Sequence, residues 1–194
     1  MVVIIGLERE RSKMMSEAEL TIPDNVTFED AIALTQDLMG KMENNAISPS
    51  QVQETISALV ASSNGARGFF VTYLSSESPL ADYPSDEVLT ALKTSPELVS
   101  ELLVKNVAMS TAMAITHRRQ ENGSMAQGSA RVQRRSIHLI QQLNHELIQQ
   151  QAQQMRDSAL TGKGEAEVAF FQRWGYDDQQ RNAIAQALAQ VIET

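Results

Sequence analysis

Residues 102–115 read LLVKNVAMSTAMAI, and this stretch decides the fold class because it is apolar or small on nearly every helical face. The preceding Ser95-Pro96-Glu97 has a capping serine, a proline at the first helical position and an acid in the first turn. The pattern predicts one helix over residues 96–119. A helix that is apolar all round belongs in the centre of a bundle.

Lys105 and Asn106 interrupt this apolar stretch. Burying an unpaired amine or amide costs stability. We therefore expect Lys105 to reach solvent and Asn106 to make a buried hydrogen bond.

A second long helix is predicted over residues 130–160, after a mobile connection at 120–129 that contains Gly123 and Gly128. At about 1.5 Å per residue this helix would be about 45 Å long. Two long helices joined by a short loop pack antiparallel. The pair 96–119 and 130–160 is therefore expected to form the centre of the protein.

Start and stop signals place further helices upstream. Thr27 with Asp30, and Ser48 with Gln51, have the spacing of capping pairs. Asn64-Gly65 reads as the stop of the helix that begins after Ser48. Both helices carry apolar residues at helical spacing.

Residues 69–73, FFVTY, suit either a strand or a short helix, and the absence of other strand signals favours a helix. Gly175 fits the left-handed position after a helix, and Asp177 with Gln180 begins the last one. The sequence thus predicts an all-α fold, an irregular bundle of about six to eight helices.

Length and composition set the domain organisation. The chain has 194 residues, of which 42% are apolar and 21% charged, which is enough to bury a core. We expect residues 1–22 to be a loosely packed N-terminal tail and residues 23–194 to form a single helical domain.

Several kinds of chemistry are disfavoured by the residues themselves. The chain has no cysteine, which removes thiolate metal sites and thiol catalysis, and it has three histidines. His145 lacks a second histidine four residues later, where Gln149 stands, and His138 lies two helical turns away. Residues 161–164, TGKG, lack the earlier glycine of a phosphate-binding loop. We assign no catalytic residue, no metal site and no cofactor.

Charge distribution is the most informative feature. The net charge is −8, yet residues 118–156 carry six arginines and only two acids. We define the Arg/His face as the basic and histidine side chains expected on one side of the second long helix: Arg131, Arg134, Arg135, His138, His145 and Arg156. Three interpretations stay open: a solvated or intramolecularly paired surface, docking onto an acidic protein or a second copy, and nucleic-acid binding. Nucleic acid is disfavoured because lysines and aromatic residues are scarce near this face.

A separate anion-binding candidate consists of Arg67, Arg118 and Arg119. Arg67 stands in a Gly-Ala-Arg-Gly turn before a helix, where free backbone N–H groups can hold an anion. This candidate supports an alternative function, a helical enzyme that binds a small molecule or an anion. Such an enzyme would need a concave pocket at Arg67, or at His117 and Arg118.

The sequence shows no export or membrane signal. The apolar run at residues 2–7 is shorter than a signal peptide requires and lacks a basic leader. We expect a soluble cytoplasmic protein that does not act at a membrane. Its expected function is non-enzymatic protein–protein contact through the Arg/His face, as a homo-oligomer, an adaptor or a regulator.

Overall fold

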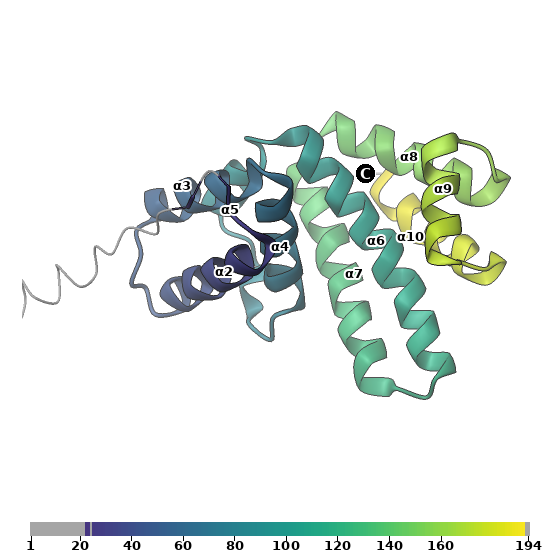
Figure 1. The fold of residues 1–194 in the computed structure, drawn as a ribbon, viewed down its shortest axis with the longest axis horizontal. Coiled ribbons are helices and arrows are strands. Elements are labelled where there is room, and N and C mark those ends of the chain that lie inside the picture. The colour runs from purple at the N-terminus through teal and green to yellow at the C-terminus, as the bar shows by residue number, and fades with distance from the viewer. Residues whose placement is uncertain (1–21, 24, 193–194) are drawn as a thin grey trace, which may run out of the picture.

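The computed structural model describes residues 22–23 and 25–192, and in this part of the chain it contains nine α-helices, one short 3-10 helix and no strand. The helices, labelled as in Figure 1, are α2 (Phe28–Glu43), α3 (Pro49–Val60), α4 (Ser63–Ser75), η1 (Pro79–Ala81), α5 (Asp86–Leu92), α6 (Pro96–Arg119), α7 (Gly123–Leu143), α8 (Glu146–Thr161), α9 (Glu165–Trp174) and α10 (Asp178–Ile192). The predicted all-α bundle is confirmed.

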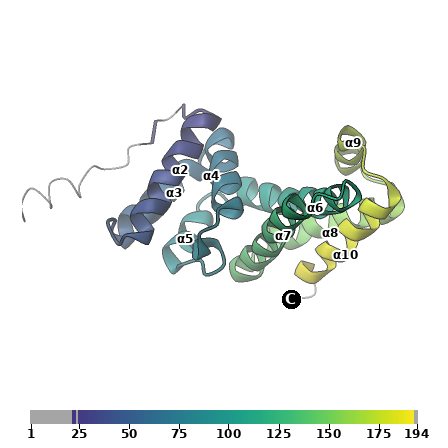
Figure 2. The same ribbon diagram turned by 90° about the horizontal axis from the view of Figure 1, so that it is seen from below.

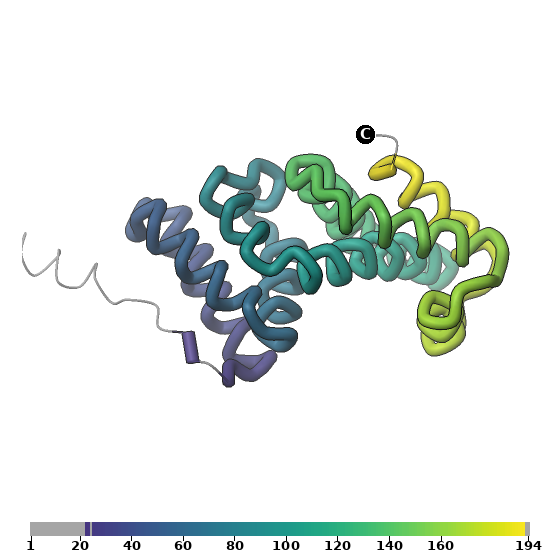
Figure 3. The backbone as a smooth tube through the Cα atoms, turned by 90° about the horizontal axis from the view of Figure 1, so that it is seen from above, coloured from purple at the N-terminus to yellow at the C-terminus, as the bar shows by residue number. Residues whose placement is uncertain are grey.

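The helices form two groups on either side of a central pair. Helices α2, α3, α4 and α5 gather at one end, and α8, α9 and α10 gather at the other (Figure 1). Between them α6 and α7 pack antiparallel, as predicted, and α6 links the two groups (Figure 3).

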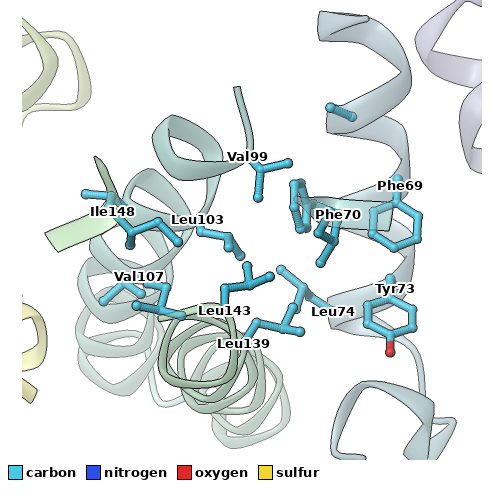
Figure 4. Packing of buried hydrophobic residues seen from close by; sticks show 14 of the residues in the cluster. Phe69, Phe70, Tyr73, Leu74, Val99, Leu103, Val107, Leu139, Leu143 and Ile148 are labelled. Carbon is cyan, nitrogen blue, oxygen red and sulfur yellow. The ribbon is translucent and has the colours of Figure 1, made fainter. Parts of the chain in front are cut away.

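Buried side chains of α4, α6, α7 and α8 pack against one another in the core (Figure 4). Each of these helices contributes side chains that are at most 5% exposed: Phe70, Leu74, Val99, Leu103, Val107, Leu139, Leu143 and Ile148. Aromatic rings extend this core into α4, where Phe69 stacks on Tyr73 with ring centroids 5.1 Å apart. One face of α6 is therefore fully used in packing.

Helix α6 is the only described helix long and apolar enough to cross a membrane by length and composition. Its most apolar window is 56% buried inside the protein. This is the situation of a central bundle helix, as expected from residues 102–115. The rest of α6 stays partly exposed, and this remainder forms the site described below.

The helix predicted over residues 130–160 is divided in two. Asn144 adopts the left-handed conformation (φ 43°, ψ 55°), which ends α7 at Leu143. His145 then caps α8, because its Nδ1 accepts a hydrogen bond from the N–H of Leu147 (3.2 Å). Asparagine is one of the few non-glycine residues that tolerate this conformation. The change of direction places α8 against α10 and α6.

Two predicted connections are helical instead. Helix α7 begins at Gly123, where the side chain of Asn122 accepts from the N–H of Met125, so most of the predicted 120–129 connection belongs to α7. Asn64-Gly65 does not end a helix but lies in the first turn of α4, after the capping Ser62. In both places a polar cap outweighs the low helix propensity of glycine.

The predicted caps of Thr27 and Ser48 are confirmed, and Ser48 forms a reciprocal capping box with Gln51. Asp177 and Gln180 cap each other as well: the N–H of Gln180 donates to Asp177 Oδ1 (2.9 Å), and the N–H of Asp177 donates to Gln180 Oε1 (3.1 Å). The Gln180 amide also donates to the carbonyl of Ala112 (3.1 Å). This contact fixes the start of α10 against α6.

The predicted tail at residues 1–22 lies almost wholly outside the described residues. One hydrophobic cluster runs from Val26 to Val191. The assignment of residues 23–194 to a single domain stays a prediction.

Candidate protein-binding groove

A long groove runs along α6 on the face that does not enter the core. It consists of two cavities: one of about 710 Å³ between α4, α6 and α9, and one of about 550 Å³ between α6 and α7. The two cavities share four lining residues, Ser75, Asn106, Met109 and Val132. They are therefore one continuous surface. Figure 2 shows α4 and α9 on either side of α6.

The floor of the groove is a stripe of α6. Its members recur at helical spacing and are only half-buried: Leu98, Leu102, Asn106, Met109 and Met113. Side chains three to four residues apart lie on one helix face. Because α6 is apolar all round and its neighbours cover only part of it, this stripe remains open to solvent.

The walls present large apolar side chains to solvent. Val71 on α4 is 47% exposed, Trp174 at the end of α9 is 48% exposed and Met125 on α7 is 52% exposed. Five large apolar side chains are exposed among the described residues, and these three of them line the groove. Exposed apolar side chains that line one groove make this surface a candidate for an interaction site.

The Asn106 side chain does not make the buried hydrogen bond that the sequence predicted. It is half-buried in the floor, and its amide makes no hydrogen bond with any residue that the structure describes. Lys105 beside it pairs with Glu101 one turn earlier. The two polar residues that interrupt the apolar stretch therefore mark the side of α6 that is open.

The charged side chains of the groove are unevenly paired. Arg131 binds Glu77 (2.6 Å), and its hydrogen bond holds the pKa of the Glu77 carboxyl below its ordinary value. The guanidinium group of Arg67 lies over the ring of Phe28, 5.3 Å from its centroid. Arg173 on α9 has no ion-pair partner among the described residues.

The Arg/His face is not one continuous surface, because Asn144 divides its helix. Two arginines of α7 pair with a carboxylate of the same chain: Arg134 contacts Asp82 (3.2 Å), and Arg135 contacts the same carboxylate (2.6 Å). Arg135 is only 2% exposed, so it is removed from the set of partner-binding candidates. Its spacing identifies it as a core position, four residues before the buried Leu139.

The other members of the Arg/His face are scattered. His138 lines a polar cleft of about 640 Å³ together with Tyr83 and Arg134. His145 caps α8, and Arg156 on α8 lies 3.6 Å from Asp157. The structure therefore brings Arg134 and His138 together and leaves His145 and Arg156 apart from them.

The anion-binding candidates are also separated. Arg67 lines the groove on α4, whereas Arg118 and Arg119 lie exposed in the last turn of α6. Arg119 binds Asp177 (2.6 Å) and lowers the pKa of that carboxyl. The described residues contain no group of three or more side chains that could hold a metal ion.

The groove itself was not predicted from sequence. Its walls come from α4 and α9, which are about a hundred residues apart in the chain, and no periodicity links them. The available signal was the pair Lys105 and Asn106, since polar residues inside an otherwise apolar helix indicate that one side of it is open.

No curated protein and no solved structure matches the chain. A family model matches residues 27–191, which cover all of the helices described above except the last residue of α10, Ile192. The chain belongs to the family described as Uncharacterised conserved protein UCP020893.

Proposed function

We propose that this protein acts by protein–protein contact and that the groove along α6 receives an amphipathic helix of a partner protein. The single observation that carries the proposal is the continuity of the two cavities over an exposed apolar stripe of α6. Helix-in-groove recognition uses such a surface, with anchors at every third or fourth residue of the ligand.

The length of the groove supports a helical ligand. The stripe from Leu98 to Met113 spans about 22 Å at about 1.5 Å per residue, which corresponds to about four helical turns. A helix laid along it would cover the part of α6 that the other helices leave open. Met109, Met113 and Met125 give the surface flexible, polarisable side chains that adapt to different partners.

Protein contact was also expected from the Arg/His face, but we now propose a different surface for it. Three arginines of that face bind Glu77 or Asp82 within the chain. The groove, in contrast, exposes apolar side chains for which the described part of the chain supplies no cover.

A peptide-display selection tests the proposal. Peptides from a random library are selected on the wild-type protein and counter-selected on the double variant Val71→Glu/Trp174→Glu. Both positions are about half exposed, so the variant should fold. The matched control is Leu160→Glu, which changes an equally exposed apolar residue outside the groove.

We expect the selected peptides to carry apolar residues at helical spacing. They should bind wild type and Leu160→Glu equally. They should bind the double variant at least about tenfold more weakly, which is equivalent to about 1.4 kcal/mol of binding free energy. Failure to obtain peptides that distinguish the double variant would contradict the proposal. Light scattering of the free protein identifies a second copy as the occupant if the wild type is an oligomer and the double variant is a monomer.

A further inference from the structure

Two arginines of the groove lack a carboxylate partner. Arg67 on α4 and Arg173 on α9 are both exposed, and they lie on the two opposite walls of the larger cavity. Neither forms an ion pair with any residue that the structure describes. Arg67 is held in place by its contact with the ring of Phe28.

This lack of partners is unusual within the chain. Six of the described arginines bind a carboxylate: Arg119, Arg131, Arg134, Arg135, Arg156 and Arg181. Of the three that do not, Arg118 lies at the end of α6, and the other two face the groove. In a chain with 24 acidic residues against 16 basic ones, partners for an arginine are plentiful.

The acidic residues of the groove are already neutralised. Glu101 pairs with Lys105, and Glu77 pairs with Arg131. The groove therefore presents an apolar floor with two uncompensated positive charges, one on each side.

Resting on the proposed function, we propose that the partner helix is acidic, with Asp or Glu on both edges of its apolar stripe to pair with Arg67 and Arg173. A guanidinium group binds a carboxylate through two parallel hydrogen bonds. The apolar stripe faces α6, and the flanking acids meet the two walls. The net charge of −8 repels an acidic partner at long range, so these pairs slow dissociation rather than speed association.

A charge series of one peptide tests this inference. The best peptide from the selection is made in three versions that keep its apolar residues and carry Glu, Gln or Lys at the flanking positions. Binding of each version is measured by fluorescence anisotropy. The proteins are wild type, Arg67→Gln, Arg173→Gln and the double variant, with Arg118→Gln as the matched control.

We expect wild type and Arg118→Gln to bind the Glu peptide about tenfold more tightly than the Gln peptide and to bind the Lys peptide most weakly. Each single variant should lose part of this preference and the double variant all of it, while the Gln peptide binds every protein alike. Arg67→Lys should keep part of the preference.

Two results would overturn the inference in distinguishable ways. Equal binding of all three peptides would show that charge plays no part, while the groove would still bind a helix. Absence of groove-dependent peptides in the selection would reject the proposed function together with the inference. Binding of sodium laurate that Val71→Glu/Trp174→Glu abolishes, without any peptide binding, would assign the groove to a fatty acid and equally overturn it.

Discussion

Arg135 on α7 donates two parallel hydrogen bonds to the carboxylate of Asp82, from Nε to Oδ1 (3.0 Å) and from Nη2 to Oδ2 (2.6 Å). Its three remaining N–H groups donate to backbone carbonyls at the end of α4 and just after it, those of Leu74 (3.0 Å), Ser76 (2.7 Å) and Ser78 (2.7 Å). All five donors of a buried guanidinium are thus satisfied, which is what its burial requires.

Replacing Arg135 should destabilise the protein strongly. In Arg135→Met the side chain keeps its apolar stem, but the Asp82 carboxylate and the carbonyls lose their donors. We expect the free energy of unfolding to fall by about 3 kcal/mol, as when one partner of a buried pair is removed. Denaturant unfolding measures this. Arg134→Gln, at a side chain that is 66% exposed, should cost less than about 1 kcal/mol. Similar losses in both variants would contradict a special role for Arg135.

Asp82 should make stability depend on pH in the acid range. Hydrogen bonds from Arg135, and secondarily from Arg134, lower its pKa from 3.8 to about 2. A carboxyl with a lowered pKa stabilises the folded state above its ordinary pKa, and this contribution is lost as the pH falls from about 4 through about 2. Unfolding free energies measured from pH 7 to pH 2 should therefore fall more steeply for wild type than for Asp82→Asn. Glu54→Gln, an exposed change on α3, should follow wild type.

Gly68 should be required for the close approach of α4 to α2. A Cβ at this position would lie 2.5 Å from the Cβ of Ala31 and 2.9 Å from the carbonyl oxygen of Phe28. We expect Gly68→Ala to cost about 1–3 kcal/mol through overpacking. Gly40 on α2 has no atom within 4 Å of the same position, so Gly40→Ala should stabilise by up to about 1 kcal/mol. Thermal unfolding measures the stability of both variants. If Gly40→Ala is also less stable than wild type, helix propensity does not determine the effect of alanine at Gly40.

Asn144 should matter through its backbone conformation rather than its side-chain contacts. Alanine adopts the left-handed conformation less readily than asparagine. We therefore expect Asn144→Ala to lower the free energy of unfolding by about 1 kcal/mol. Asn144→Gly should be neutral or stabilising, because glycine adopts this conformation without strain. If both variants lose equally, the side-chain contact with Gln149 carries the effect instead.

Local signals carried most of the fold prediction. The apolar stretch 102–115 and the caps at Thr27, Ser48 and Asp177 depend on residues within one or two helical turns, and the structure forms each of them as expected. The sequence did not predict the helix break at Asn144, because an asparagine inside a polar, glutamine-rich helix is also an ordinary surface residue. Its left-handed conformation turns the chain so that α8 packs on α10, and no local pattern encodes that contact.

The candidate site was less predictable for the same reason. Arg135 was grouped with its exposed neighbours by charge, although its partners are carbonyls and a carboxylate more than 50 residues away. Val71 and Trp174, which lie on the walls of the groove, are single apolar residues in separate helices. No sequence pattern predicts that they lie along the same groove. Only the floor of the groove is indicated by the sequence, because Lys105 and Asn106 interrupt the apolar stretch.

The arrangement around Arg135 also orders events during synthesis of the chain. The carbonyls of Leu74, Ser76 and Ser78 receive their donor from a residue that emerges 57 to 61 positions later. Until α7 has been made and has docked, the end of α4 and the turn that follows it lack these bonds, and so we expect the N-terminal group of helices to complete its folding only together with the central pair. A single guanidinium group thereby links the end of α4 and the turn that follows it to the central pair of helices.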